Sequence, residues 1–485
     1  MESQLAKFII EAQGKSKDEI SSENPYRDIG FDGNNKRLGW MRIIPFSKIE
    51  SWFEQIQTVL NNKERFIFIG MGGSSNGIKS LLALNEKHNC YVLDSLDPAA
   101  LAQIIDKIKS NPLSAGKLNK TLIIPISKSG TTKETQQLAN TLKELLLNEL
   151  GDNHWQKNFL WLADPESFSK LDSLGWDDIF KLPIQFDEES DIGGRFACPH
   201  TAIFYLPLFL LLNRDTKRLE EVYLEFNSYL AQSRSQAYDF SVKYKDQECA
   251  YFSPIVEERL GSAFGPWVVQ LFQESLGSKI EGLSVKTVVS FHHNDDMFFP
   301  LRLDLEITNS VVYLMCQMYF FQVFIAFYSA HKSINFVNQD FVEKYKEQLK
   351  KLSDQKRHEV ESARLTQIID KVKHAIKPNH KFIEIVLFFH PQGQVISDIQ
   401  GKFAAVFKDR RVFVFIGSDW NHHSYQAAFG DRDTFFVLLT STKYFKDIPL
   451  VQKETLINNI DTLKLIAQAT YQTIQDKSIL CAYNL

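Results

Sequence analysis

The chain has 485 residues, of which 44% are hydrophobic and 24% charged, and its formal net charge is -4. This length exceeds what one hydrophobic core usually supports, so we expect two core-forming lobes. No stretch gathers enough Lys and Arg to follow a nucleic-acid backbone, which argues against nucleic acid as a partner. The five cysteines are far apart and odd in number, a pattern that fits neither a zinc cluster nor a disulfide framework. Together with an N-terminus that lacks the apolar core of a signal peptide, this predicts a cytoplasmic protein.

The first 60 residues read as a helical segment interrupted by a turn-rich stretch at 24–39. Short apolar runs then alternate with helical patterns, such as a leucine stripe from Leu138 to Leu146 that Gly151 closes. The predicted strands of this series are FIFIG (66–70), CYVLD (90–94), TLIIPIS (121–127) and NFLWLA (158–163). Alternating strands and helices predict the α/β class, a doubly wound parallel sheet with helices on both faces.

A second series of strands follows: CAYFS (249–253), FIEIVLFF (382–389), VFVFIG (412–417) and TFFVLLT (434–440). The helical connection between the two series places a lobe boundary near residue 220. We therefore expect a first αβα lobe at 61–220 and a second at 221–485, which includes the C-terminal helices.

One uncharged segment, residues 311–330, is long enough to span a membrane. It contains Gln317 and Gln322, and the sequence has no second segment of this kind. We interpret it as a buried helix of a large α/β protein and expect no membrane partner.

The first loop of interest is IGMGGSSNG (69–77), which links a predicted strand to a predicted helix. Such a turn lets backbone N–H groups approach an anion, so Gly73 and Ser74 are candidate ligand contacts. A dinucleotide site is an alternative, supported by Asp94 at the end of the next strand. Ser75 occupies the position of the third glycine, so that fingerprint is incomplete.

The second loop, ISKSGTTKET (126–135), is denser in hydroxyl groups and opens the leucine-striped helix. At a helix N-terminus these donors can grip a phosphate dianion without a metal ion. The residues predicted to bind phosphate here are Ser127, Lys128, Ser129, Thr132 and Thr135.

Two further segments carry candidate catalytic groups. In DIGGRFACPH (191–200), two glycines permit close approach of a ligand and Arg195 can hold a developing oxyanion. In GPWVVQLFQESLGSK (265–279), a proline near the start and Gly277 at the C′ position place Glu274 in the last helical turn. A carboxylate there faces the negative end of the helix dipole, which favours its protonated form.

Two later segments supply further polar groups. INFVNQDFVEKYKEQL (334–349) predicts a helix that carries Lys346, with Gln339 in the loop before it. GSDWNHHSYQAAFG (417–430) presents His422 and His423, a titratable pair suited to acid–base work. We expect no metal site, since the adjacent histidines at 292–293 would coordinate one ion poorly.

Together, these six segments resemble glucose-6-phosphate isomerase, the family built from two sugar-isomerase (SIS) domains. GMGGSSNG, SKSGTTKET, GGRF and the ES-L-G segment match its motifs, and the resemblance covers most of residues 65–440. NQDFVEKYK places Gln339 and Lys346 on the family's glutamine and lysine. Here the histidine segment follows the lysine segment, a permuted order that resembles the isomerase half of transaldolase–isomerase fusions. The family histidine aligns with His422, although His423-Ser424 imitates the same H-S pair one residue later.

The resemblance implies two SIS-type domains and a reversible conversion of glucose 6-phosphate to fructose 6-phosphate, without a cofactor. His422 and Lys346 would open the sugar ring, Glu274 would shuttle a proton through an enediolate, and Arg195 would stabilise its charge. The resemblance also implies a homodimer in which each site borrows the histidine from its partner. Two alternatives stay open: a sugar-phosphate-binding SIS regulator without turnover, and an isomerase that also accepts mannose 6-phosphate.

Overall fold

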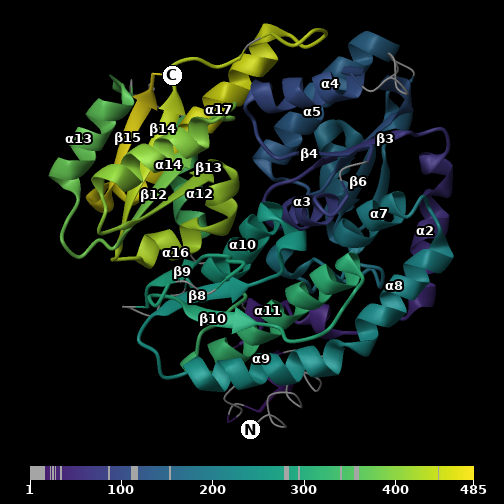
Figure 1. The fold of residues 1–485 in the computed structure, drawn as a ribbon. Coiled ribbons are helices and arrows are strands. Elements are labelled where there is room, and N and C mark those ends of the chain that lie inside the picture. Colours follow the sequence, from purple (N-terminus) through teal and green to yellow (C-terminus); the bar gives the residue numbers. More distant parts are fainter. Residues whose placement is uncertain are drawn as a thin grey trace.

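The computed structural model describes residues 17–484, apart from 22, 24–26, 28, 33–34, 86–87, 111–117, 152–153, 278–282, 293–294, 339–340, 354–359 and 446. The chain folds into three groups of parallel strands covered by helices (Figure 1). The expected α/β class is therefore confirmed. All eight predicted strands are present, each within three residues of its expected ends.

The first sheet has the order β4-β3-β5 and continues through single bridges into β6-β7, with all neighbours parallel. Side chains alternate across it, so Phe66 and Phe68 enter one core and Ile67 and Ile69 enter another. Its strands are β3 (Arg65–Ile69), β4 (Cys90–Leu93), β5 (Thr121–Pro125), β6 (Leu160–Ala163) and β7 (Phe180–Pro183). The helices of this region are α2 (Phe46–Leu60), α3 (Asn76–Leu82), α4 (Pro98–Ser110), α5 (Lys133–Leu150), α6 (Phe168–Leu171) and α7 (Ala202–Leu211).

The second sheet is small, with the order β10-β8-β9 and parallel pairing. Its strands are β8 (Ala250–Ile255), β9 (Val285–Thr287) and β10 (Phe299–Arg302). The accompanying helices are α8 (Thr216–Ser228), α9 (Leu230–Tyr244), α10 (Gly265–Leu276) and α11 (Ser310–Lys332).

Helix α11 contains the apolar segment at 311–330. It is the one helix in the described part of the chain that is long and apolar enough to cross a membrane, and 89% of its apolar window is buried inside the protein. The interpretation as a buried core helix is confirmed.

The third sheet is parallel, with the order β11-β15-β14-β12-β13. Its strands are β11 (Ser362–Ala363), β12 (Phe382–Leu387), β13 (Arg411–Ile416), β14 (Thr434–Ser441) and β15 (Ser478–Tyr483). Its helices are α12 (Val342–Ser353), α13 (Leu365–Ala375), α14 (Val395–Val406), α15 (Asp419–His423), α16 (Tyr425–Gly430) and α17 (Lys453–Thr473).

The division after residue 220 differs from the expectation. Residue 220 lies inside helix α8, and the strands of 221–485 form two sheets instead of one. Strand β8 pairs only with β9 and β10 in the described chain, whereas β12 lies between β13 and β14 in another sheet. An apolar run predicts a buried strand but says nothing of its neighbours, because neighbours are chosen by the path of the crossover connections.

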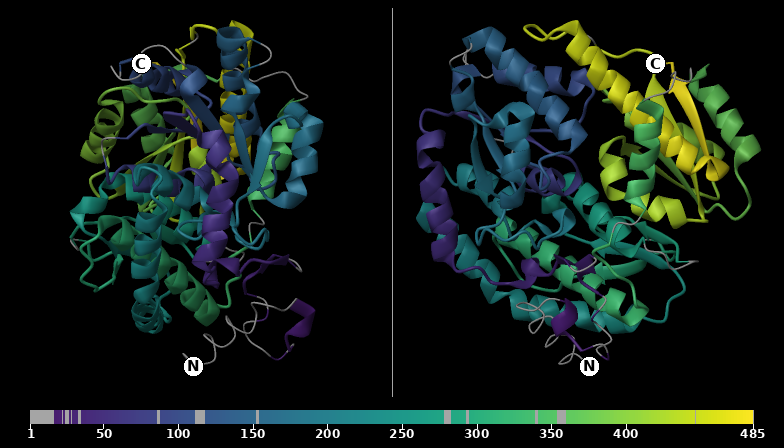
Figure 2. Two further views of the ribbon diagram at one scale, coloured as in Figure 1. Left: turned by 90° about the vertical axis from the view of Figure 1, so that its right-hand side faces the viewer. Right: turned by 180° about the vertical axis from the view of Figure 1, so that it is seen from behind.

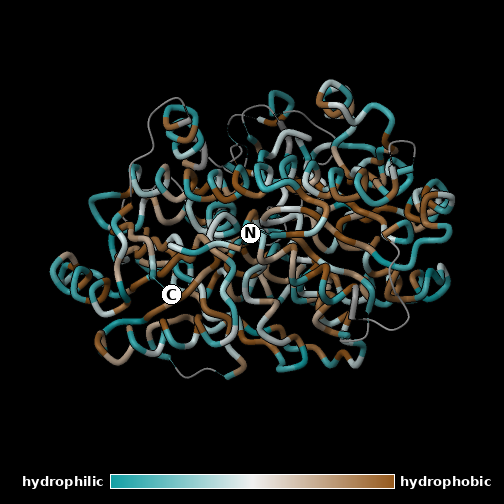
Figure 3. The backbone as a smooth tube through the Cα atoms, turned by 90° about the horizontal axis from the view of Figure 1, so that it is seen from above, coloured by the Kyte–Doolittle hydropathy of each residue, from teal (hydrophilic) through white to brown (hydrophobic). Residues whose placement is uncertain are grey.

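The N-terminal segment also differs in part. Helix α2 confirms its helical end, but the described residues before it hold short 3-10 turns and the strand pair β1 (Phe31–Asp32) and β2 (Asn35–Lys36). Views from the side and from behind place α2 beside the first region and the described residues before it lower down, next to the second region (Figure 2). Hydrophobic stretches concentrate in the interior, and hydrophilic turns lie at the periphery (Figure 3).

Helix α10 lies where the three groups meet (Figure 1). It contacts α3 and the turn after β3 from the first region, α11 and β9 from the second, and α15 and α16 from the third. All residues from Trp267 to Leu276 are buried. Polar groups on α10 are therefore surrounded by side chains from every part of the fold.

Candidate active site

The centre of the candidate site is an ion pair between Glu274 of α10 and Arg195. The Arg195 Nη1 donates to Glu274 Oε1 at 2.9 Å, and its Nε donates to Ser275 Oγ at 2.8 Å. Glu274 is 5% exposed and Arg195 2%. Two residues that lie far apart in the sequence, each predicted to carry chemistry, are thus in direct contact.

Burial raises the pKa of the Glu274 carboxyl, and Arg195, Gln270 and His422 only partly oppose this. The expected position in the last turn of the helix is correct, since α10 ends at Leu276. Gly277 differs from expectation: its φ is -70°, so it is no left-handed C′ residue. Its lack of a side chain serves packing, because a Cβ would lie 2.5 Å from the backbone N of Ala427 in α16.

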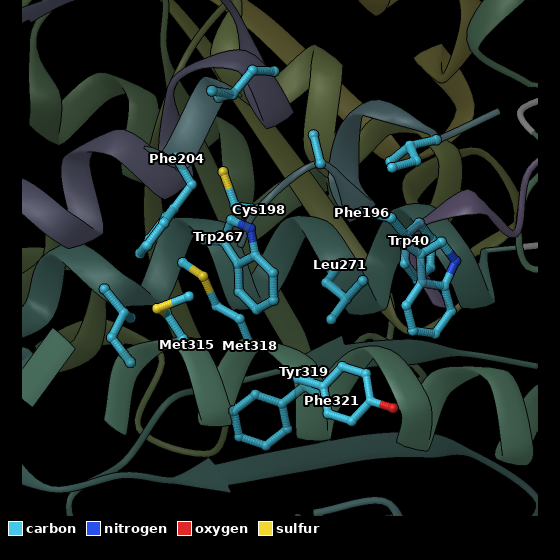
Figure 4. Close-up of a cluster of buried hydrophobic side chains, with 14 of the residues drawn as sticks. Trp40, Phe196, Cys198, Phe204, Trp267, Leu271, Met315, Met318, Tyr319 and Phe321 are labelled. Atoms are coloured by element: carbon cyan, nitrogen blue, oxygen red, sulfur yellow. The ribbon is translucent and has the colours of Figure 1, made fainter. Parts of the chain in front are cut away.

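Contacts from distant segments hold Arg195 and the loop that carries it. Its Nη2 donates to the Phe336 carbonyl at 2.5 Å. The Gln322 amide of α11 donates to the carbonyls of Phe196 (3.2 Å) and Cys198 (2.8 Å). Phe196 stacks on Trp40 with ring centroids 5.0 Å apart (Figure 4). The guanidinium is therefore preorganised next to the carboxyl group.

Gln270 was not among the predicted residues, although it lies one helical turn before Glu274. Its Nε2 donates to Glu274 Oε2 at 3.0 Å and to the His422 carbonyl at 3.3 Å. Its Oε1 accepts a hydrogen bond from Asn76 Nδ2 at 3.2 Å. Its i, i+4 spacing from Glu274 could have revealed it, because such residues share one helix face.

The two candidate histidines occupy different environments. His422 Nε2 contacts Glu134 Oε1 at 2.9 Å. Burial opposes the imidazolium, but Glu134 and then Asp419 outweigh it and raise the pKa of His422. His423 instead contacts Ser424 Oγ through Nδ1 at 2.6 Å, and burial lowers its pKa to about 4. His422 is the one whose ring contacts Glu134, and its backbone carbonyl accepts from the Gln270 amide.

Glu134 is a second residue that the sequence analysis did not select. It lies in the first turn of α5, within the phosphate-loop motif, and is 6% exposed. An acidic residue at a helix N-terminus complements the helix dipole, which was the available signal.

Lys346 lies in α12. Its positive charge disfavours the charged form of His422 and so partly opposes the rise in the pKa of His422. The structure thus places it within electrostatic reach of the site. Gln339 lies outside the described residues.

The hydroxyl-rich loop follows β5 and opens α5, as expected. Ser127 and Thr132 bond to each other through their hydroxyls at 3.0 Å, and the exposed Ser129 bonds to Thr131 at 2.9 Å. Among the described residues, the buried Thr135 hydroxyl has no hydrogen-bond partner. Since β3 and β5 are adjacent and parallel, this loop and the glycine turn after β3 lie at the same edge of the sheet.

Lys128 contacts the segment of chain that precedes Arg195, and its expected contact with substrate stays a prediction. Its ammonium group bonds to the Ile192 carbonyl, lies 3.5 Å from the Ser190 carbonyl and is 3.5 Å from Asp164 Oδ2. Lys128 therefore connects the phosphate loop to the segment of chain, residues 190–192, that precedes Arg195. The sequence motif could not indicate this, because the 190–192 segment is some sixty residues away.

The glycine turn after β3 lies directly against polar groups of other site segments. Gly72 N donates to Asp419 Oδ1 at 2.9 Å, and a Cβ on Gly73 would lie 2.2 Å from the Gly194 carbonyl. Gly73 thus lets the turn approach the Arg195 loop, while the half-buried Ser74 lies at its end. Asp94, the ribose-binding candidate of the dinucleotide alternative, instead pairs with Lys79 at 2.6 Å.

Within one chain, His422 contacts Glu134 through its ring and Gln270 through its backbone carbonyl. The third sheet packs against the first through α5 and α17, which brings these residues together. The expectation that each site borrows the histidine from a partner stays a prediction. Among the described residues, no three His, Cys, Asp or Glu side chains form a metal-binding group.

The family model for phosphoglucose isomerase matches residues 48–216, which include the glycine turn, the phosphate loop and Arg195. The resemblance to this family is confirmed. A glucose-6-phosphate isomerase of Campylobacter jejuni is 27% identical over 44% of this chain and 51% of its own length. One from Clostridium tetani is 26% identical over 51% of this chain and 58% of its own length.

The chain thus spans about half the length of these relatives. A crystal structure of a glucose-6-phosphate isomerase from Chlamydia trachomatis superposes with a TM-score of 0.49 and 15% identity, covering 73% of this chain and 83% of that one. Glu274, Lys346 and His422 all lie beyond the residues that the family model matches.

Proposed function

We propose that this protein is an aldose–ketose isomerase that interconverts glucose 6-phosphate and fructose 6-phosphate. The contact that supports this most directly is the buried pair of Glu274 and Arg195. Moving a proton between C1 and C2 of a sugar phosphate requires a base that can also act as an acid, next to a cation that stabilises the enediolate. Glu274, whose pKa burial raises, fits the first role and Arg195 the second.

His422 and Lys346 act on the ring oxygen and the adjacent hydroxyl in this proposal. The contact with Glu134 favours the charged form of His422, which can donate a proton as the ring opens. Ser127, Thr132 and Thr135, at the N-terminus of α5, would hold the phosphate, and Gly73 and Ser74 would approach the sugar. No step requires a metal or organic cofactor, so we expect full activity in EDTA.

The test is a coupled assay in which fructose 6-phosphate is the substrate and glucose 6-phosphate is detected by its dehydrogenase. Run in D₂O, the reaction should introduce deuterium at C2 of the product, since an enediolate exchanges its proton with solvent. Binding of fructose 6-phosphate without turnover would identify a regulator instead. Formation of mannose 6-phosphate beside the glucose epimer would reveal the broader isomerase.

A further inference from the structure

A group of charged side chains lies buried between the second and third sheets. Lys286 of β9 bonds to Glu384 of β12 and lies 2.9 Å from Asp431 Oδ2, just after α16. Each of the three residues is 1% exposed. We call Lys286, Glu384 and Asp431 the buried ion cluster. Its members come from two different sheets, so it exists only when those sheets pack in one arrangement.

The cluster is fully bonded. Asp431 Oδ2 accepts from Thr434 Oγ1 at 2.7 Å, and its Oδ1 accepts from the Asp433 N–H at 2.8 Å. Burial disfavours the charge of Lys286, but Asp431 and Glu384 outweigh it and raise its pKa, so the ammonium stays charged. A buried ion cluster adds little net stability over apolar residues of the same volume, whereas it tolerates few alternative geometries. Such a cluster suits a role in fixing how the two sheets meet.

A side-chain hydrogen bond connects this cluster to the histidine segment. The Trp420 indole N–H donates to Glu384 Oε2 at 3.0 Å, and Trp420 is 0% exposed. Trp420 and His422 both belong to α15, which has only five residues and begins at Asp419. So short a helix cannot hold its orientation by its own backbone bonds, and its direction depends on tertiary contacts.

The cluster also connects to the base. Lys286 lies on β9, the strand that follows α10, and α10 packs against β9. Glu274 therefore lies on the element next to one end of the cluster, and His422 on the element next to the other. Proton transfer and ring opening occur at adjacent atoms of one sugar, so the two groups must be held in register.

We propose that the buried ion cluster positions the histidine side of the site against the base side, with Trp420 as the link to His422. Lys286, Glu384, Asp431 and Trp420 are positioning residues that do not touch substrate. This inference rests on the proposed isomerase function for its kinetic consequence, but its structural consequence can be measured without substrate.

The experiment compares Trp420→Phe with Trp161→Phe. Both tryptophans are 0% exposed. Trp161, in β6, is the matched control because its indole N–H has no hydrogen-bond partner among the described residues. Trp420→Phe removes the link and leaves the ion cluster intact. We expect its kcat to fall on the order of tenfold or more with little change in KM, because His422 is displaced. Trp161→Phe should retain the kcat of the wild type.

The second readout is the titration of His422 by NMR with labelled histidine and no substrate. If α15 loses its orientation, the contact with Glu134 weakens and the pKa of His422 falls in Trp420→Phe but stays unchanged in Trp161→Phe. Equal effects of the two substitutions, or an unshifted His422 in Trp420→Phe, would overturn the proposal. If the wild type shows no isomerase activity, the proposed function fails, and the titration alone then decides on the positioning role.

A further pair of variants separates buried from exposed contacts. Arg411 and Asp295 also join the third sheet to the second region, at 2.8 Å, but their side chains are 47% and 33% exposed. Arg411→Ala should leave kcat and the His422 titration unchanged, since exposed ion pairs impose little order. Glu384→Gln should change both in the direction of Trp420→Phe. The opposite ranking would contradict a role for the buried ion cluster.

Discussion

Glu274 and Glu134 make similar contacts, but their pKa values are shifted in opposite directions. Each is almost fully buried, and each lies 2.9 Å from one cationic partner, Arg195 or His422. Burial by itself favours the protonated form of both carboxyls and so acts to raise both pKa values. In Glu134 the charge and hydrogen bond of His422 and its own backbone N–H outweigh burial, so its pKa is lowered, whereas the pKa of Glu274 is raised.

Helix position accounts for part of this difference. Glu134 lies in the first turn of α5, where the helix dipole favours a carboxylate, and Glu274 lies in the last turn of α10, where it does not. When the pKa values of two carboxyls in one site are shifted in opposite directions, one can carry protons and the other can remain charged. The raised pKa of Glu274 and the lowered pKa of Glu134 therefore predict that Glu274 moves the substrate proton and Glu134 keeps His422 protonated.

The largest effect is expected for Glu274→Gln, which removes the proton carrier and keeps its shape. We expect kcat to fall by about three orders of magnitude, with fructose 6-phosphate still bound, as the coupled assay and a binding titration would measure. The folded state should persist, since the amide still accepts from Arg195. Turnover close to that of the wild type would remove Glu274 from this role.

A smaller loss, of about a hundredfold or less in kcat, is expected for Glu134→Gln, because His422 stays in place but loses the anion that favours its charged form. The pH above which activity declines should move downward, since the pKa of His422 is no longer raised. A pH–rate profile of both proteins measures this. An unchanged profile would show that His422 does not depend on Glu134.

The same pair should affect stability within a defined pH window. A raised His422 pKa gives stability that is present below its unfolded value of about 6.5 and is lost as pH rises through the folded value. A lowered Glu134 pKa gives stability present above about 4.3 and lost as pH falls through the folded value. Glu134→Gln should therefore cost about 1–2 kcal/mol of unfolding free energy near pH 5.5 and less at pH 8, by urea denaturation. An equal loss at both pH values would contradict the ion pair.

The smallest expected effect is none at all. Inactive His422→Ala and Glu274→Gln proteins, unfolded and refolded together, should stay as inactive as either parent if each chain completes its own site, as the contacts of His422 within one chain indicate. A mass tag on one variant would establish whether mixed oligomers form. Recovery to about a quarter of the wild-type activity would mean that a partner supplies the histidine after all.

The sequence by itself determined the local features of this protein. Apolar runs of five to eight residues identified eight of the strands, and the uncharged segment at 311–330 identified a buried helix. The proline and glycine around α10 located Glu274 near the end of its helix. These features depend on residues a few positions apart, so the local pattern contains the information.

The sequence patterns did not identify strands β1, β2, β7, β9, β10, β11 and β15. All of these except β15 have at most four residues, too short for a clear alternation, and β15 follows α17 directly through a short turn. Gln270 and Glu134 were also missed, although both lie within segments selected for other residues. Their importance depends on which side chains face them, and those come from distant segments.

Only the tertiary structure decided which strands share a sheet, which histidine faces Glu134, and what Lys128 holds. Each outcome depends on contacts between residues far apart in the chain. Strand β8 belongs to a different sheet from β12, β13 and β14, and His422 contacts Glu134, which is 288 positions away in the sequence. The neighbouring residues His422 and His423 have the same chemistry, so no local pattern could separate them. Burial and charge separated them, because the carboxylate of Glu134 raises the pKa of His422, whereas burial lowers the pKa of His423.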